Sequence, residues 1–311
     1  MNYKQCAKTL LSHDNILILS HKNPDGDTTA SSAALCSALR RAGRRAWMYN
    51  NSQIGRKLRP FVADYLAPED FAPKFVVSVD IASETLLPLG FEGKVDLAID
   101  HHPSNTHFAA EELVRSERSS CAEVVAELIM GINEDIIEEE ATLLYIGLST
   151  DTGCFQYSNT NANSFRCAAE LLRCGADNRL VNTIFFRRVT QARLKLESMI
   201  YAGMHYYREG KLTVATISLD MMEQARATED DCDDLAGLAG RVEGSVVSIT
   251  IKEQADGSCK ISVRSTPEVN SSQICAVFGG GGHAMAAGCR IMGSPSQVEE
   301  MLVQVVDEVW K

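Results

Sequence analysis

The pattern of apolar and polar positions divides the first part of the chain into short buried segments that alternate with amphipathic ones. Short, predominantly apolar runs, typical of strands buried on both faces, occupy residues 15–20, 45–49, 75–79 and 95–99. Helical spacing of apolar positions covers residues 2–12, 28–42, 120–130, 134–147 and 164–174. This order predicts an α/β domain with a doubly wound, mainly parallel sheet.

A different pattern follows, beginning with a polar helix expected over residues 187–205. Strand-like runs then cover 212–218, 245–253 and 260–265, and helical spacing covers 271–277 and 296–310. We therefore expect two domains with a cleft between them. The larger spans residues 1–187, a connecting helix spans 188–207, and a smaller α/β domain spans 208–311.

Composition narrows the class of protein. The 311 residues are 45% hydrophobic and 23% charged, which is ordinary for a globular protein of two domains. A net charge of -11 disfavours long duplex nucleic acid, whose binding depends on phosphate neutralisation, although a local cluster of cations could hold a small phosphorylated ligand. With no run of ~18 apolar residues and no signal peptide, we expect no membrane partner and a cytoplasmic protein. The ten cysteines include no C-x-x-C pair, which predicts reduced thiols.

Acids and imidazoles follow the apolar segments. Asp80 follows one strand-like run, and the run 95–99 leads into the sequence Asp-His-His. Segment 143–148 carries two signals, an apolar strand-like run that leads to Asp151 and the end of the helical spacing described above. Because functional groups gather at the carboxyl ends of strands in α/β sheets, we expect these side chains to converge. The full candidate set is His21, Asp25, Asp27, Asp80, Asp100, His101, His102 and Asp151.

Oxygen-rich ligand sets favour hard divalent cations, and imidazole shifts the preference toward Mn, Fe, Co or Zn. Six of the candidates, without Asp100 and His102, are expected to be ligands, and four of these six are carboxylates. This number exceeds the needs of one structural zinc and suits two cations that share a bridging carboxylate. A single Asp at a strand end is usually a cap or turn former, and a single His is usually structural. Here several acids and imidazoles together follow the apolar segments, which favours the interpretation as a metal site.

The run FGGGGHAMAAG is the informative motif of the second domain. Four consecutive glycines let backbone N–H groups converge on an anion, and His283 can donate to a phosphate or stack on a base. A flexible linker is the alternative, but the flanking apolar segments argue against it. We expect substrate contacts from Gly280, Gly281, Gly282 and His283.

Five motifs in order, HxNPDGD, Asp80 after a strand, DHH, TDTG and GGGGH, resemble the DHH phosphoesterase family with its DHHA1 domain, and within it the nanoRNase and pAp-phosphatase type. The resemblance implies two cations, Mn²⁺ with Mg²⁺ or Co²⁺ as alternatives. It assigns one to His21 and Asp25, the other to Asp27, His101 and Asp151, with Asp80 bridging. The PDGD loop continues as TTASS here, which departs from the small-residue turn of the family.

The same resemblance suggests roles for Asp100 and Arg264, and we also expect roles for His102, which is not needed as a ligand, and for Asn105 in the run DHHPSN. Asp100 would orient the neighbouring imidazole. His102 would contact the substrate phosphate or protonate the leaving oxygen, with a structural role as the alternative. Asn105 would contact substrate, and Arg264 would grip a terminal phosphate in bidentate fashion, with a solvated surface arginine as the alternative.

The expected reaction is hydrolysis by a water activated between the cations. Expected substrates are short 5′-phosphorylated oligonucleotides, linear dinucleotides such as pApA and pGpG, and 3′-phosphoadenosine 5′-phosphate (pAp). An inorganic pyrophosphatase would need a different phosphate-binding C-terminal domain, and a RecJ-like exonuclease would need extra length and a positive groove. A catalytically silent nucleotide-binding protein is opposed by the complete ligand set. A homodimer is compatible with the sequence.

Overall fold

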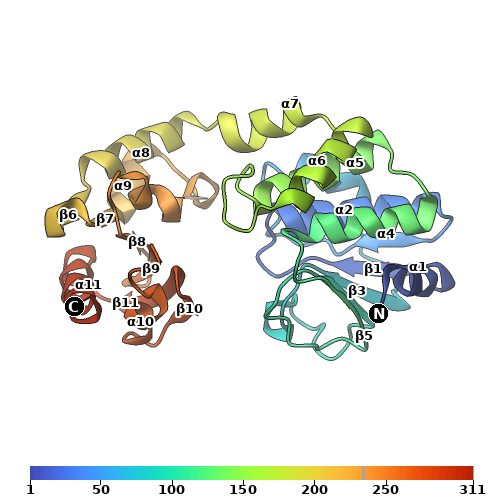
Figure 1. Cartoon of the computed structure of the whole chain (residues 1–311), viewed down its shortest axis with the longest axis horizontal. Helices are drawn as coiled ribbons and strands as arrows, with labels where there is room; N and C mark the ends of the chain where they lie inside the picture. The colour runs from blue at the N-terminus through green and yellow to red at the C-terminus, as the bar shows by residue number, and fades with distance from the viewer. Residues whose placement is uncertain (233–234, 311) are drawn as a thin grey trace. The chain divides into compact units, whose positions relative to one another are not determined.

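The computed structural model describes residues 1–232 and 235–310 (Figure 1). The chain divides into two compact units, Met1–Arg188 and Val189–Lys311. Each has its own hydrophobic core.

The first unit is built on a parallel sheet, which confirms the α/β prediction. Its strands are adjacent in the order β2-β1-β3-β4-β5, and every pair is parallel. The bounds are β1 (Ile16–Leu19), β2 (Ala46–Met48), β3 (Phe75–Val79), β4 (Leu97–Asp100) and β5 (Glu111–Val114). The order reverses between β1 and β3, where open α/β sheets place their ligand sites.

Helices cover one face of this sheet. They are α1 (Tyr3–Ser12), α2 (Gly26–Arg41), α4 (Cys121–Asn133), α5 (Glu138–Asp151) and α6 (Ala162–Arg173), with short helices α3 (Arg59–Val62) and α7 (Asn178–Val181). Helix α2 packs against both α4 and α5, and residues 26–39 are all buried. Its small side chains, among them Ala30, Ala33 and Ala34, permit that close approach. The opposite face is covered by loop residues such as Phe71, Phe91 and Phe108.

The second unit contains a six-stranded mixed sheet in the order β10-β11-β9-β8-β7-β6. The strands are β6 (His205–Tyr207), β7 (Leu212–Ile217), β8 (Val247–Glu253), β9 (Ser258–Ser265), β10 (Gly281–His283) and β11 (Ala286–Met292). Only β7 and β8 pair in parallel among these described strands. Helices α10 (Ser271–Ala276) and α11 (Pro295–Val309) cover one face.

The helix expected over residues 187–205 is shorter. A π-helical segment, η3 (Asn182–Arg187), ends the first unit, and α8 (Gln191–Ala202) begins the second. Leu196 and Ile200 of α8 are buried in the second unit's core, together with residues of α9 (Leu219–Ala225) and η6 (Leu235–Arg241). Among the described residues, no helix has the length and apolar character to cross a membrane.

Candidate metal centre

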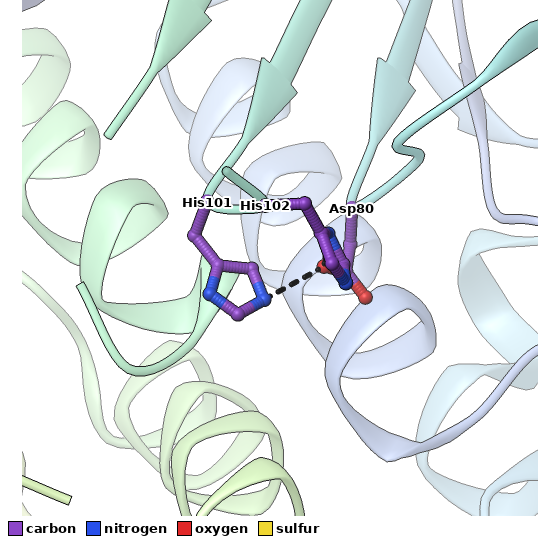
Figure 2. Close-up of side chains that lie close together, drawn as sticks. All are labelled: Asp80, His101 and His102. Carbon is purple, nitrogen blue, oxygen red and sulfur yellow. Dashed lines mark ion pairs between the residues drawn. The ribbon is translucent and has the colours of Figure 1, made fainter. Parts of the chain in front are cut away.

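Three adjacent strands deliver side chains to one edge of the first sheet. His21 lies just after β1, Asp80 directly after β3, and His101 directly after β4. Figure 2 shows Asp80, His101 and His102 close together at the strand ends. Because β1 and β3 flank the point where strand order reverses, this edge is where a ligand site is expected.

Asp80 sits at a sharp turn of the backbone. Its φ is 62°, in the left-handed region that Asp and Asn enter more readily than most residues. Its N–H donates to the Ile99 carbonyl at 2.9 Å, so β4 holds the turn. The carboxylate is 4% exposed. This local conformation fixes Asp80 at the centre of the cluster.

The start of α2 supplies two further acids. Helix α2 begins at Gly26, before the expected residue 28, and Asp25 is its N-cap, accepting from the Thr28 N–H at 3.1 Å. Asp27 lies in the first turn and is 1% exposed. Gly26 is needed for packing, since a Cβ there would lie 2.3 Å from Oγ1 of Thr150.

Asp151 was expected to follow a strand, but it reaches the cluster from the end of a helix. The segment 143–148 is helical, and Asp151 is the last residue of α5. Helix α5 packs on α2, and Gly147 makes that contact so close that a Cβ would lie 2.7 Å from Oδ1 of Asp27. The strand-like interpretation of this run was wrong because a fully buried helix is as continuously apolar as a buried strand.

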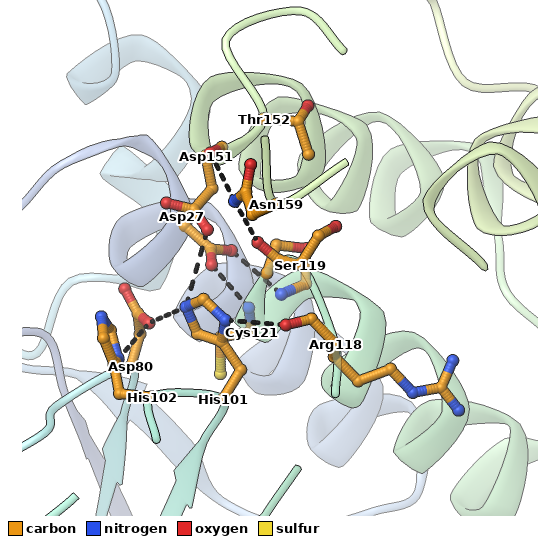
Figure 3. Close-up of polar contacts among 12 residues, drawn as sticks. Asp27, Asp80, His101, His102, Arg118, Ser119, Cys121, Asp151, Thr152 and Asn159 are labelled. Carbon is orange, nitrogen blue, oxygen red and sulfur yellow. Dashed lines mark hydrogen bonds and ion pairs between the residues drawn. The ribbon is translucent and has the colours of Figure 1, made fainter. Parts of the chain in front are cut away.

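These side chains form overlapping groups that could each hold a cation. Their ligand atoms lie within 4.8 Å of one another in each of three groups. His101 Nε2 is 3.3 Å from Asp80 Oδ1 and 3.6 Å from Asp151 Oδ2 (Figure 3). The groups are His21, Asp25 and Asp80; Asp27, His101 and Asp151; and Asp80, His101 and His102.

The residues present fit a divalent cation. Asp80 Oδ1 and His101 Nε2 are buried and lie 3.3 Å apart, yet neither makes a hydrogen bond of good geometry with the other or with any other described residue. Buried polar atoms are rarely left this way unless something else binds them. Burial and then the charges of Asp80 and Asp151 raise the pKa of Asp27 well above its usual range. Cations would offset that repulsion, which the carboxylates otherwise relieve by taking up protons.

Protonation of His101 and Asp151 reflects the same crowding. Burial alone would lower the pKa of His101, but Asp80, Asp27 and Asp151 together raise it to about 10. Burial raises the pKa of Asp151 to about 7. The cluster therefore holds protons at the positions where positive charge is favoured.

Neighbouring groups orient the imidazoles. His101 Nδ1 lies 3.2 Å from the Arg118 carbonyl oxygen, which favours a proton on Nδ1 and turns Nε2 toward the acids. The fully buried Asp100 lies 2.8 Å from His102 Nδ1 and accepts from the His101 N–H at 2.8 Å. Asp100 thus orients the His102 ring, with Nε2 as the nitrogen left for other partners.

Asn105, which the sequence predicts to contact substrate, makes internal contacts in the structure. Its side chain is buried and donates to Asp100 Oδ2 at 2.6 Å and to the Ile81 carbonyl at 3.4 Å. Its Oδ1 accepts from the His107 N–H at 2.8 Å. These internal contacts occupy the amide, because a buried carboxylate such as Asp100 needs donors. The structure therefore shows a role for Asn105 in holding Asp100, and a substrate contact by Asn105 stays a prediction.

The start of α4 also faces the centre, which the sequence alone did not reveal. Asp27 accepts from the backbone N–H groups of Cys121 and Ala122 at 2.6 and 2.9 Å. These N–H groups lie in the first turn of a helix, so they have no partner within the helix, and negative charge is favoured there. Asn159 donates to the carbonyls of Ser119 and Asp151 at 3.0 and 3.1 Å, joining the two segments (Figure 3). In the sequence, the N-cap pattern at residues 119–123 marks the start of this helix and was the signal that could have revealed the contact.

In the second unit, the glycine run is an edge strand rather than a loop. Gly281–His283 form β10, paired with β11 so that His283 faces Ala286 and Gly282 faces Ala287. A Cβ on Gly280 would lie 2.3 Å from the Gly288 carbonyl oxygen, so the strand packing itself requires glycine there. This is a physical reason for the glycines that is separate from ligand binding.

Arg264 lies on the same sheet as β10. It is exposed on β9, with Nη1 3.1 Å from the Val263 carbonyl oxygen. Its partner across the ladder is Ala286, which in turn faces His283. Directly paired residues share a face of a sheet, so Arg264 and His283 lie on one face with Ala286 between them.

Two family models match the chain: the DHH family N-terminal domain over residues 15–148 and the DHHA1 domain over residues 209–311. The Thermus thermophilus "Bifunctional oligoribonuclease and PAP phosphatase NrnA" is 32% identical, covering 94% of this chain and 89% of that protein. The Bacillus subtilis protein of the same name is 25% identical over 92% of each chain. An exopolyphosphatase-related protein of Bacteroides fragilis has a TM-score of 0.88 at 22% identity, covering 98% and 96% of the two chains.

These matches identify the class of protein as a metal-dependent phosphoesterase, which confirms that the chain is an enzyme. Specifically, the chain belongs to the DHH family and carries a DHHA1 domain, as its motifs predicted.

Proposed function

We propose that this enzyme uses two divalent cations, Mn²⁺ by preference, to hydrolyse the phosphoester bonds of short 5′-phosphorylated oligonucleotides and of small nucleotides such as pAp. The observation that carries the proposal is the pair of three-residue groups that meet around Asp80 and His101 within bonding reach of a cation. The printed names of the relatives, oligoribonuclease and PAP phosphatase, support the substrate class.

In this proposal, His21 and Asp25 would hold one cation, Asp27, His101 and Asp151 would hold the other, and Asp80 would serve both. Such ions lower the pKa of a water and stabilise charge on phosphoryl oxygens. His102, held through Nδ1 by Asp100, presents Nε2 to the substrate.

His102 is suited to protonate the leaving oxygen. Burial lowers the pKa of its ring, but the hydrogen bond with Asp100 and the nearby charges outweigh burial and raise the pKa above the usual value. Its side chain is 39% exposed, so a ligand can reach it. In the second unit, Arg264 and His283, on the same face, are assigned to the substrate phosphates, and Gly280, Gly281 and Gly282 to close backbone approach.

The test is turnover of a substrate panel by the protein loaded with Mn²⁺. The panel contains pAp, pApA, pGpG, a 5′-phosphorylated RNA pentamer, long single-stranded DNA and pyrophosphate. Asp80→Asn is the control, because asparagine tolerates the backbone conformation at this position while removing the charge. We expect turnover of pAp, the dinucleotides and the pentamer, abolished by chelation and by Asp80→Asn. Cleavage of pyrophosphate alone would contradict the substrate class, and full activity in Asp80→Asn would contradict the site.

A further inference from the structure

One face of the second sheet carries cations that the proposed chemistry leaves unused. Side chains on β9 alternate between the two faces: Ile261 and Val263 are buried against the core beneath α10 and α11. Lys260 and Arg264 point the other way and are exposed. On β7 and β8 that second face is covered by α8 and η6, where Thr250 donates to the Ala236 carbonyl. Helix η6 also contacts β9, and the exposed positions of this face on β9 and β11 include Lys260, Arg264, Gly288 and Arg290.

Three cations lie side by side across this face; Lys260 and Arg290 are exposed, whereas the Lys252 side chain is only 14% exposed. In the sheet register, Lys260 is opposite Lys252 of β8 and also opposite Arg290 of β11. Facing residues on neighbouring strands lie ~5 Å apart, where like charges destabilise a sheet. Two of the three charges are balanced: Lys252 pairs with Glu229, and Arg290 with Asp256 at 2.7 Å. Among the described residues, no acid pairs with Lys260.

This cationic row, defined as Lys252, Lys260 and Arg290, shares its face with Arg264. Lys260 precedes Arg264 by four residues on β9, a distance of ~13 Å at the rise of a strand. Between the two positions lie Ser262 and its partner Gly288, whose small side chains leave the surface free of obstruction. The face thus presents cations at both ends of a low, neutral stretch.

We propose, resting on the function proposed above, that the cationic row is a second phosphate subsite that binds the downstream backbone of an oligonucleotide whose terminal phosphate is held at Arg264. A stacked strand rises about 3.4 Å per nucleotide, so ~13 Å corresponds to about four nucleotides, and fewer in an extended chain. Only substrates of three or more nucleotides reach the row. It therefore distinguishes oligonucleotides from dinucleotides and from pAp.

The test compares substrates of different length. Lys260→Glu reverses the unbalanced charge at an exposed position, so the core is not altered. Lys8→Glu is the matched control, since Lys8 is exposed on α1 of the other unit and the change in net charge is the same. With Mn²⁺ at low salt, we expect Lys260→Glu to raise the KM for a 5′-phosphorylated RNA pentamer about fivefold or more. The KM for pAp and pApA stays within about twofold of wild type in both variants. The slope of log KM against log salt for the pentamer becomes shallower by about one in Lys260→Glu.

An unchanged pentamer KM in Lys260→Glu, or an equal rise for all three substrates, overturns the inference. Its failure is separable from failure of the proposed function, which would appear as a wild-type protein that hydrolyses none of the panel. In that case, fluorescence anisotropy with a labelled 5′-phosphorylated pentamer decides the inference on its own. Equal affinity of wild type and Lys260→Glu for that probe overturns it, and weaker binding by the variant supports it.

Discussion

At the scale of single residues, the centre depends on buried groups that hold the side chains facing the cations. Asp100 is the clearest of them, because it is fully buried and yet contacts both histidines of the motif and Asn105. Its negative charge stabilises a protonated His102 ring and fixes which nitrogen faces outward.

Replacing Asp100 by asparagine tests this positioning role. The amide can present only one acceptor oxygen, so either His102 or Asn105 loses its acceptor, and the His102 pKa falls. We expect kcat to decrease about 10- to 100-fold with a small change in KM, and the basic limb of the pH profile to move to lower pH. Asp14→Asn is the control, since Asp14 precedes β1 at the opposite end of the strand from His21. A loss of thermal stability alone, with an unmoved pH profile, would show that Asp100 acts only in folding.

Glycines that separate α2 from α5 set the position of Asp27. In Gly147→Ala, the new Cβ would lie 2.7 Å from Asp27 Oδ1 and 2.9 Å from the Ala122 Cβ. We expect destabilisation of about 1–3 kcal/mol and weaker Mn²⁺ binding, because the carboxylate must move. The matched control is Gly131→Ala in α4, whose Cβ meets only Ala7 at 3.7 Å and which gains helix propensity. Thermal unfolding with chelator and a calorimetric Mn²⁺ titration measure both effects; equal behaviour of the two variants would contradict this account.

At the scale of secondary-structure elements, the strand β10 contains one glycine that its packing requires, Gly282, and one that its packing does not require, Gly281. Gly282 has φ +145° and a Cβ there would lie 2.6 Å from the Ala286 carbonyl oxygen, whereas a Cβ on Gly281 would meet nothing within 4 Å. We therefore expect Gly282→Ala to lower the melting temperature and Gly281→Ala to leave it unchanged. A higher KM in Gly281→Ala at unchanged stability would identify close ligand approach as the role of that glycine. Destabilisation by Gly281→Ala would contradict the open space at this position.

The elements that could be predicted are those whose sequence carries a strong pattern. The strands β1, β3 and β4 are buried and mostly apolar, so their ends, with His21, Asp80 and His101, were found from the sequence. The edge strand β5 reads EELV and is largely solvated, and the glycine strand β10 carries a single side chain, His283, which cannot show a period. Both are held by pairing with a neighbour, which a local pattern does not contain.

Within the site, too, features with a local sequence pattern could be predicted and contacts between distant segments could not. The six expected ligands could be chosen from residue type and motif, but the support from the α4 N-terminus, Asn159 and the Arg118 carbonyl depends on tertiary packing. The internal hydrogen bonds of Asn105 also depend on tertiary packing. Its loop position suggested solvent, while the folded chain turns its amide toward Asp100.

At the scale of the whole molecule, the crowded acids couple stability to pH and to metal. In the metal-free protein, Asp151 has a pKa of about 7 and His101 of about 10, both above the values of an unfolded chain. The folded state therefore keeps protons that the unfolded state has released, and stability falls as pH rises from about 4 toward 7 for Asp151 and from about 6.5 toward 10 for His101. Divalent cations bind the deprotonated ligands, so their stabilising effect grows over the same range.

Melting temperatures at pH of about 5.5 and 8, each with chelator and with Mn²⁺, test this dependence of stability on pH and metal. We expect the metal-free protein to melt lower at the higher pH, and the increase on adding Mn²⁺ to be larger there. Asp151→Asn isolates the contribution of this carboxyl, because it removes the titrating group while keeping similar volume. The difference between wild type and Asp151→Asn in chelator should shrink as pH falls, since the protonated carboxyl and the amide are both neutral. A Mn²⁺ effect that is equal at both pH values would mean that the acids are not metal ligands, whatever their proximity.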